Sequence, residues 1–280
     1  METGQKTIQK SSKIDKNLNS ELSIQVSLNG LSFCILDTFK NAIIYYKTIT
    51  FNNKQTPHKI LEELKSVLDE DEMISTDFHK LNIIHDNELS TVVPKPLFNE
   101  DCIADYLKFN SRILRTDFIT YDDIVTNDSV NVYIPYVNIN NYIYDRFGEF
   151  VYRHYSTILI VSLLRENKNS NGKKMYVHKH SNSHFEIIVI DNGKLLLYNT
   201  FECTSKEDYI YYILFTAEQL ELNPEEFTLY LLGNIKDGDE FYTITFKYVR
   251  HVNIVNPSTQ YNIEDEAKEA SSDYILLNSF

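Results

Sequence analysis

Three histidines with the spacing of a metal site stand close together in the chain: His178, His180 and His184. On a strand, residues two apart point to the same face, so His178 and His180 would lie side by side, and a turn would bring His184 back toward them. Three converging imidazoles can hold a zinc ion and support hydrolysis. However, the intervening Ser-Asn-Ser is typical of a plain hairpin, and no carboxylate stands at a metal-motif spacing. We therefore prefer exposed strand and turn histidines and expect no metal or other cofactor.

Three aspartates end predicted strands and are candidates for general acid or base catalysis. Asp37 and Asp191 each close the second strand of a three-strand run, and Asp86 closes the strand after the first helix. Aspartate also favours turns, because its side chain bonds to nearby backbone N–H groups, and this interpretation is simpler. The sequence contains no Gly-x-Ser-x-Gly elbow, and no cysteine has a base beside it, so no catalytic residue is predicted.

Phosphate-binding loops need closely spaced glycines, because the backbone must approach the anion without a Cβ atom in the way. The chain has only seven glycines, and no two of them stand at the spacing of a dinucleotide fingerprint or a P-loop. Those two nucleotide-binding motifs are therefore excluded.

The bulk composition indicates a globular chain with an acidic surface. Its 280 residues are 42% hydrophobic, which is enough for a full core, and 40 acidic against 27 basic residues give a formal charge of -13. A surface of that sign repels nucleic acid and opposes anionic lipid. The three cysteines, Cys34, Cys102 and Cys203, lie far apart, without the spacing of a zinc or redox pair. We expect a reduced, cytoplasmic location and no nucleic-acid partner.

Neither export nor membrane insertion is predicted. Residues 1–20 are polar and lysine-rich, cannot bury enough apolar area to order themselves, and are expected to form a disordered tail. The longest apolar run, Thr157–Leu164, is far too short to span a bilayer.

The elements that must position these residues occur twice along the chain. Three strands, a helix and a further strand are predicted between residues 22 and 85 and again between 175 and 232, with matched points separated by nearly equal distances. Asn29-Gly30 and Asn192-Gly193 are hairpin signals between alternating apolar residues. Thr56-Pro57 and Thr204-Ser205 are helix starts. We predict an α/β protein built from two duplicated βββαβ halves.

The predicted organisation has four parts. Residues 21–166 form the first half, with a small α/β insertion at about 90–155, and residues 173–256 form the second half. Residues 257–280 begin acidic and end apolar, which leaves a docked segment and a tethered tail as alternatives.

The order of elements resembles that of actin-like proteins of the sugar-kinase and Hsp70 superfamily, whose halves are ribonuclease H-like. The nearest resemblance is to the PilM-like proteins of type IV pilus assembly, over about residues 22–255. Thr91–Pro94 before a helix at Asn99–Asn110, and Val130–Pro135 before a helix at Ile139–Gly148, follow that family's order. The chain also resembles an uncharacterised Bacteroidetes domain-of-unknown-function family of degenerate relatives.

The resemblance implies a nucleotide site between the halves, and the chain departs from it. Nucleotide-binding members have an aspartate- and glycine-containing turn after the first strand of each half. Here Asn29-Gly30 and Asn182 stand at those turns, and neither aspartate is present. The glycine pair before the second-half helix is replaced by Cys203-Thr204, and only Gly233 remains of the adenosine-side pair. Loss of these groups removes phosphate and magnesium contacts.

The sequence therefore predicts a catalytically inactive actin-like binding or scaffold protein. A diverged actin-like ATPase or sugar-kinase-like enzyme is the alternative, and a histidine-metal hydrolase is a third. We expect the partner to be a protein or peptide held against the first half or its insertion, because PilM-like relatives bind a segment of a membrane-bound partner. Four tyrosines in and beside the insertion are candidate contacts: Tyr133, Tyr136, Tyr142 and Tyr144. Their alternative role is to fill the core of the insertion.

Overall fold

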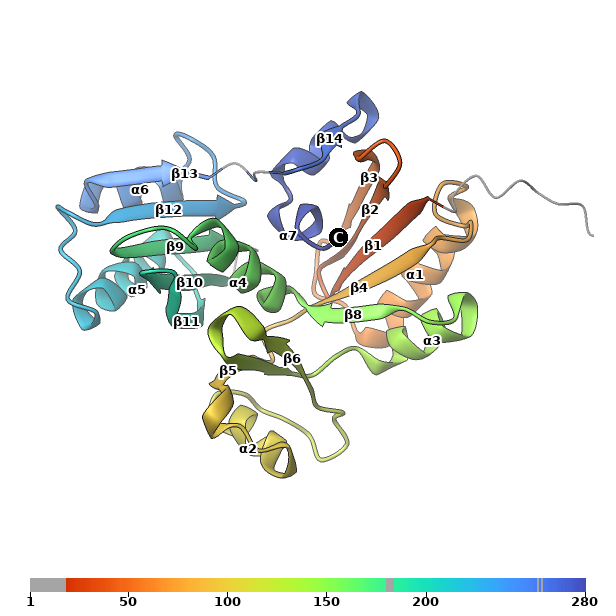
Figure 1. The fold of residues 1–280 in the computed structure, drawn as a ribbon, viewed down its shortest axis with the longest axis horizontal. Helices are drawn as coiled ribbons and strands as arrows, with labels where there is room; N and C mark the ends of the chain where they lie inside the picture. The colour runs from red at the N-terminus through yellow and green to blue at the C-terminus, as the bar shows by residue number, and fades with distance from the viewer. Residues whose placement is uncertain (1–18, 180–183, 256, 258) are drawn as a thin grey trace, which may run out of the picture.

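The computed structural model describes residues 19–179, 184–255, 257 and 259–280, and it contains two mixed β-sheets that face each other (Figure 1). The first sheet has the spatial order β14 (Asn262–Ile263), β3 (Ala42–Thr50), β2 (Gly30–Asp37), β1 (Ser20–Ser27), β4 (Lys80–Asp86) and β8 (Val151–His154). The second sheet has the order β11 (Lys194–Glu202), β10 (His184–Asp191), β9 (Lys173–Lys179), β12 (Thr228–Gly233) and β13 (His251–Ile254). A small third sheet has the order β5 (Ser90–Pro94), β7 (Ser129–Tyr133) and β6 (Thr120–Ile124).

The two large sheets repeat one topology, which confirms the predicted α/β fold class. The order β3-β2-β1-β4-β8 in the first sheet corresponds to β11-β10-β9-β12-β13 in the second. In each sheet the first three strands are joined by antiparallel hairpins, and the remaining two add in parallel. A parallel strand needs a crossover connection, which explains the helix between the third and fourth strands of each half.

The two predicted hairpin glycines are used differently. Asn192 and Gly193 both have positive φ angles, 48° and 76°, as a tight hairpin turn requires. In contrast, the first hairpin turns at Leu28 and Asn29, and Gly30 is the first residue of β2, outside the left-handed region. Gly30 is needed because a Cβ atom there would lie 2.4 Å from the carbonyl oxygen of Ile49 on the neighbouring strand β3.

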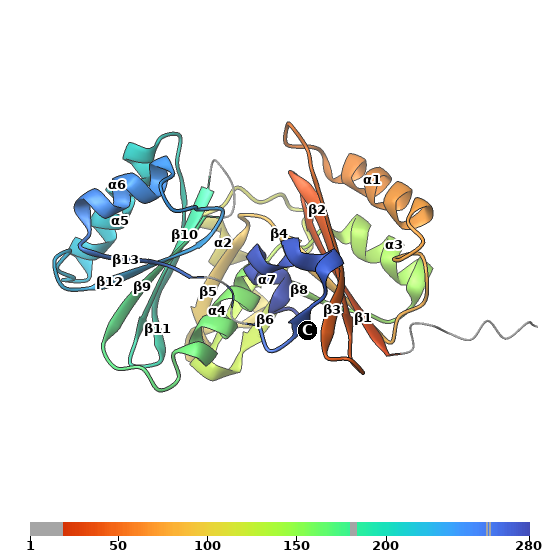
Figure 2. The same ribbon diagram turned by 90° about the horizontal axis from the view of Figure 1, so that it is seen from above.

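Helices form three layers around the two sheets, as Figure 2 shows. The outer face of the first sheet carries α1 (Pro57–Glu70) and α3 (Val137–Phe147), and that of the second carries α5 (Lys206–Gln219) and α6 (Glu240–Tyr248). Between the sheets lie α4 (Tyr155–Glu166) and α7 (Tyr274–Leu277). Strand residues alternate between these layers, so that Phe33 and Ile35 face α1 whereas Cys34 and Leu36 face α4.

The start of each major outer helix follows from its cap. The Thr56 side chain accepts a hydrogen bond from the backbone N–H of Lys59, with Pro57 in the first turn of α1. The Ser205 hydroxyl accepts from the backbone N–H of Asp208 at the start of α5. Both caps stand where the sequence predicts them. Among the described residues, no helix has the length and apolarity needed to cross a membrane.

Helix α4 is apolar on all sides and is buried by both sheets. Its side chains share one core with Leu36 and Ile84 of the first sheet and with Ile188 and Leu232 of the second. This helix is therefore the structural link between the halves.

The segment that forms the small sheet and its helix covers fewer residues than the predicted insertion. Helix α2 (Ile103–Lys108) packs on this sheet through Leu107, and three 3-10 turns lie around it, at Lys95–Leu97, Glu100–Cys102 and Val125–Asn127. However, Ile139 and Ile143 of α3 pack with α1 on the first sheet, and β8 extends that sheet. We therefore propose an insertion of about residues 90–133 in place of 90–155, since the amphipathic α3 pattern did not indicate which sheet it covers.

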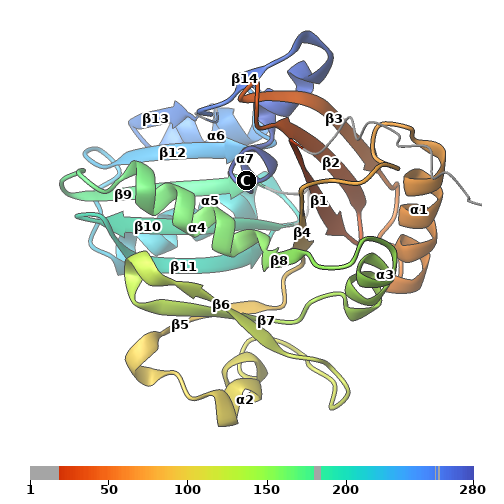
Figure 3. The same ribbon diagram turned by 45° about the vertical axis from the view of Figure 1, so that its right-hand side comes forward.

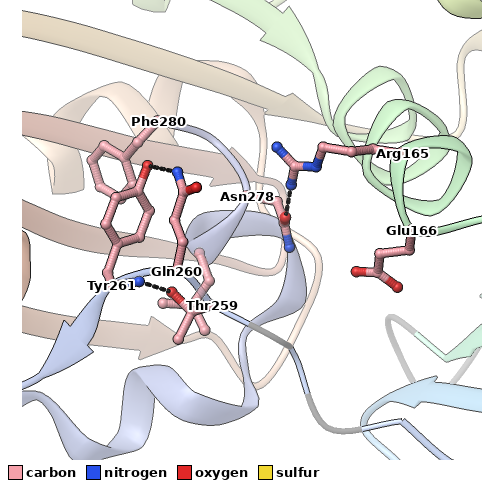
Figure 4. Close-up of a pocket in the computed structure, with 8 residues that line it drawn as sticks. Arg165, Glu166, Thr259, Gln260, Tyr261, Asn278 and Phe280 are labelled. Carbon is pink, nitrogen blue, oxygen red and sulfur yellow. Dashed lines mark hydrogen bonds between the residues drawn. The ribbon is translucent and has the colours of Figure 1, made fainter. Parts of the chain in front are cut away.

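The C-terminal segment is docked between the sheets. After the 3-10 segment Asp265–Ser272, all four residues of α7 are buried in the core around α4. Figure 4 shows Arg165 of α4 reaching Asn278, whose side-chain oxygen accepts its hydrogen bond at 2.7 Å, beside a hollow of about 300 Å³. Strand β14 pairs in parallel with β3. The chain thus returns from the second half to the first.

His85 on β4 is held as a neutral imidazole. Its Nδ1 accepts a hydrogen bond from the backbone N–H of Tyr136 at 3.2 Å, so the proton lies on Nε2, 3.0 Å from the side-chain oxygen of Asn140. Burial, followed by the nearby His154, lowers the pKa of His85 from 6.5 to about 3. Protonation would place a second N–H against that of Tyr136.

We predict that His85 makes the fold acid-sensitive. Between pH 6.5 and about 3 the unfolded chain binds one proton more at this residue than the folded chain. Stability is therefore retained above pH 6.5 and is lost as the pH falls, by about 1.4 kcal/mol per pH unit. In urea titrations at several pH values, His85→Gln should lower stability at neutral pH but flatten this slope. His58→Gln, at an exposed position of α1, is the matched control and should keep it. An unchanged slope in His85→Gln would contradict the assignment.

Candidate functional site

The carboxyl ends of four parallel strands meet at one cleft between the sheets. Ser27 of β1, Asp86 of β4, Lys179 of β9 and Gly233 of β12 all line a cavity of about 570 Å³. Asp86 also borders a second hollow of about 310 Å³. Ligands of α/β proteins commonly bind at this edge of a sheet. The cleft is therefore the first candidate site.

A buried carboxylate joins the floor of the cleft to the helix between the sheets. Glu186 of β10 is only 1% exposed. Its Oε2 lies 2.8 Å from Nδ1 of His178, and its Oε1 accepts a hydrogen bond from the Tyr155 hydroxyl of α4 at 2.7 Å. Burial, followed by the negative Glu186, raises the pKa of Tyr155 well above its usual range. Tyr155 is therefore the donor, and the network ties α4 to the second sheet.

A second carboxylate defines the opposite wall. Asp86 Oδ2 accepts a hydrogen bond from Nε2 of Gln25 at 2.8 Å, which fixes the amide of Gln25 with its nitrogen toward the carboxylate. The Tyr136 hydroxyl donates to the backbone carbonyl of Asp86 at 3.0 Å. Asp86 is thus the one strand-end aspartate that reaches the cleft.

The charges around the cleft do not favour an anion. Four carboxylates line the two hollows: Asp86, Glu88, Glu186 and Asp273. Of the lysines that line them, Lys54 pairs with Glu88 at 2.6 Å. Lys179 is 2% exposed and lies over the ring of Phe241, 4.3 Å from its centroid, and burial lowers its pKa. A polyphosphate in this cleft would meet more negative than positive groups.

The predicted nucleotide positions of the first half are present but carry little phosphate chemistry. Asn29 and Gly30 line the cleft. The backbone N–H of Asn29 is already bonded to the Ser27 hydroxyl at 3.2 Å, and Gly30 is a residue of β2 that packs against β3. Thus Gly30 is required by strand packing, a reason that the sequence pattern did not reveal.

The predicted nucleotide positions of the second half are divided between the cleft and the start of α5. Asn182 lies outside the described residues. Cys203 is buried, which raises the pKa of its thiol, and Thr204 donates from its backbone and hydroxyl to Asp208. Gly233 has φ 78°, and a Cβ there would lie 2.6 Å from the Lys179 carbonyl oxygen and against the His178 ring. Gly233 therefore allows β12 to approach β9 closely.

The candidate histidine cluster is described only in part. His178 is buried against Glu186, and His184 lies 3.5 Å from Glu202 Oε1. His180 lies outside the described residues. Within the described ranges, no group of three or more His, Cys, Asp or Glu side chains is placed to hold a metal ion.

The other two strand-end aspartates serve turns. Asp37 Oδ1 accepts hydrogen bonds from the backbone N–H groups of Phe39 and Lys40, both at 3.0 Å. Asp191 accepts from the side-chain amide of Asn192 at 2.8 Å. Asp37 thus bonds to the backbone of its turn, as the turn interpretation requires, whereas Asp191 bonds to a side chain of its turn.

The four candidate tyrosines do not form one exposed surface. Tyr133 is fully buried and donates to Asp122 at 3.0 Å. Tyr136 lines a groove, and Tyr142 packs on the first-half core while accepting from Arg146. Only Tyr144, 62% exposed, is free on the surface. The core alternative therefore describes Tyr133, and Tyr136 is the one that reaches a hollow.

Sequence reasoning missed the residues that organise the cleft, namely Glu186, Tyr155, Gln25 and Lys179. One signal was available for the first of them: Glu186 is a charge in the interior of the strand sequence HFEIIVID, which otherwise stays apolar until Asp191. A charge at such a position must find buried partners. The partners themselves come from distant elements.

Solved structures with this architecture are actin-like. A Bacteroides thetaiotaomicron protein described as having an actin-like ATPase fold and unknown function is 26% identical, with a TM-score of 0.72 over 86% of this chain and 92% of that chain. A chain of the PilM-PilN type IV pilus biogenesis complex is 11% identical, with a TM-score of 0.56 over 92% of this chain and 97% of that one. The protein therefore has the actin-like ATPase fold.

The chain belongs to the family of proteins of unknown function DUF3822, whose model matches residues 9–252. No curated protein matches the sequence. The predicted resemblance to degenerate actin-like, PilM-like proteins and to a domain-of-unknown-function family is confirmed.

We predict that Tyr155→Phe lowers the free energy of unfolding by about 1.5–3 kcal/mol, the usual contribution of a hydrogen bond to a charged group. The substitution removes the hydroxyl that donates to Glu186 and leaves the ring packed. Tyr144→Phe, which loses a hydroxyl from an exposed ring, is the control and should change stability by less than about 0.5 kcal/mol. Equal effects in urea denaturation would argue against the network.

Proposed function

We propose that this chain is a catalytically inactive actin-like protein that holds a segment of another protein, in the cytoplasm. The observation that carries the proposal is the chemistry of the cleft. Its two lysines are engaged by Glu88 and by the Phe241 ring, whereas four carboxylates line its walls. Transfer of a phosphoryl group needs cations or convergent N–H groups around the phosphates.

A groove beside the cleft offers a better surface for a peptide. It has a volume of about 410 Å³ and lies between the first sheet and the small sheet. Apolar side chains from both sides line it: Leu28, Pro57, Leu89, Phe118, Ile134, Pro135, Tyr136 and Val137. Polar groups, including Lys54, Glu88 and Asn138, stand among them. Apolar pockets with a few polar groups are typical of sites that hold a short segment.

Phe118 is well placed to contact such a segment. Its side chain is 53% exposed although it lines the groove. It therefore contributes little to the core and has apolar surface left to bury on binding. The solved complex of PilM with PilN gives one precedent of an actin-like chain that assembles with another protein. Three free cysteines, two of them buried, suit a reducing compartment.

We expect no saturable binding of magnesium-ATP at millimolar concentration in titration calorimetry. Each lost phosphate contact removes about 1–3 kcal/mol, so the loss of several takes even micromolar affinity beyond detection. A saturable isotherm that Asp86→Asn alters would favour the diverged ATPase or sugar-kinase-like alternative.

We further expect Phe118→Glu to abolish capture of the partner from lysates of the protein's own cells. A carboxylate in an apolar groove opposes docking, because it would be desolvated without a partner. Leu97→Glu, at another exposed apolar position of the same subdomain but outside the groove, is the control. Proteins enriched by the wild type and by this control, but absent with Phe118→Glu at an unchanged melting temperature, would support the groove. Capture of the same proteins by the wild type, by Leu97→Glu and by Phe118→Glu would refute the groove as the binding site.

A further inference from the structure

The segment after α2 differs in charge and exposure from the rest of the molecule. Residues 106–116 contain Lys108, Arg112 and Arg115 and no acidic residue, in a chain whose formal charge is -13. Two large apolar side chains protrude from the same segment, Phe109 at 90% and Leu114 at 67% exposure. Exposed apolar side chains next to cations are unusual for a surface that only faces water.

The backbone of this segment is held, so these side chains have a fixed direction. The N–H of Ser111 bonds to the carbonyl oxygen of Leu107, which ends α2. The N–H of Leu114 bonds to Asp117 Oδ2 at 2.7 Å, which forms the next turn. Between them Ile113 packs into the core of the small sheet. The inward Ile113 leaves the two neighbouring side chains Arg112 and Leu114 pointing outward.

The two arginines differ from Lys108 in their ion pairing within the described part of the chain. Lys108 pairs with Asp105 at 2.6 Å, whereas neither Arg112 nor Arg115 makes an ion pair with any residue that the structure describes. Figures 1 and 3 place α2 at one end of the molecule, beyond the small sheet and away from both large sheets. A flat surface can therefore approach this end without meeting either large sheet, although it would meet Asp105 and Asp117 at the two ends of the segment together with the arginines.

We propose that Phe109, Leu114, Arg112 and Arg115 form a docking surface for an anionic lipid bilayer. The arginines would lie among the headgroups, and the two apolar side chains would enter the boundary with the acyl chains. Acidic residues more than a Debye length of about 8 Å away are screened, so the groups beside the two arginines set the local field. Two protruding side chains and two cations are too few for a stable protein interface, which buries about 800 Å² on each partner.

The binding should be weak and reversible. Each arginine near an anionic surface contributes about a fivefold gain in partition. Two short apolar insertions add to this but are far smaller than a lipid anchor, which by itself gives only marginal attachment. The surface would therefore add to a partner's affinity or orient the protein, without fixing it to a membrane alone.

The test is co-sedimentation of the full chain with vesicles of phosphatidylcholine, with and without phosphatidylserine. We expect binding only to the anionic vesicles, reduced by added salt. Arg112→Gln with Arg115→Gln should lower the partition by about 25-fold. Phe109→Ser with Leu114→Ser should lower it by at least about tenfold. The matched control is Phe246→Ser with Lys247→Gln, an exposed aromatic and cation on α6, which should leave binding unchanged.

Several results would overturn the proposal. The wild type could bind anionic and neutral vesicles equally. The control variant could lose as much vesicle binding as the loop variants, or the loop variants could lose none. Binding of the wild type to polyglutamate but not to vesicles would assign the surface to an acidic protein. Because all four side chains are exposed, the variants should keep the melting temperature of the wild type. Should a double variant melt early, Arg115→Gln and Leu114→Ser alone are compared in its place.

Discussion

Burial of one apolar helix between two sheets is the constraint on which the rest of the structure depends. Helix α4 has apolar side chains on all sides, so it is stable only where both sides are covered. The first sheet covers one side and the second covers the other, with α7 completing the layer. The duplicated halves are therefore held at a defined separation. The cleft exists because this layer keeps the ends of β1, β4, β9 and β12 apart.

This layer also explains why the cleft is lined by fixed polar groups. The hydroxyl of Tyr155, at the start of α4, reaches Glu186, and Glu186 in turn holds His178 at the end of β9. Across the cleft, Gln25 holds Asp86. These side chains are thus engaged with one another. Under the proposed function the actin-like body presents surfaces to a partner, and both the groove at Phe118 and the loop around Phe109 lie in its first half.

The sequence allowed most of the two sheets to be predicted, because strands that are buried on both faces stand out as apolar runs between turn residues. The second strand was predicted to end at Asp37, and β2 does end there, at Gly30–Asp37. Helix α6 was not predicted, because its sequence EFYTITFKY is rich in strand-favouring residues. The Asp239 cap and the packing on the second-half core stabilise the helix instead. The helix predicted at Asn99–Asn110 corresponds to α2, which is shorter and covers only Ile103–Lys108.

The cleft residues were largely missed, because Tyr155, Glu186 and Asp86 meet only through the fold. The exposure of the tyrosines likewise cannot be inferred from their spacing.

Native-state hydrogen exchange of the α4 backbone amides tests most directly the claim that this helix unites the two halves. Amides exposed only by complete unfolding exchange with the free energy of global unfolding, whereas those of a loosely attached element exchange through a smaller local opening. We expect the amides from Ile158 to Leu164 to be among the slowest to exchange and to follow the global free energy as urea is added. Exchange of these amides at a lower free energy, while β1 and β9 stay protected, would show that the halves hold together without α4 and would contradict the account.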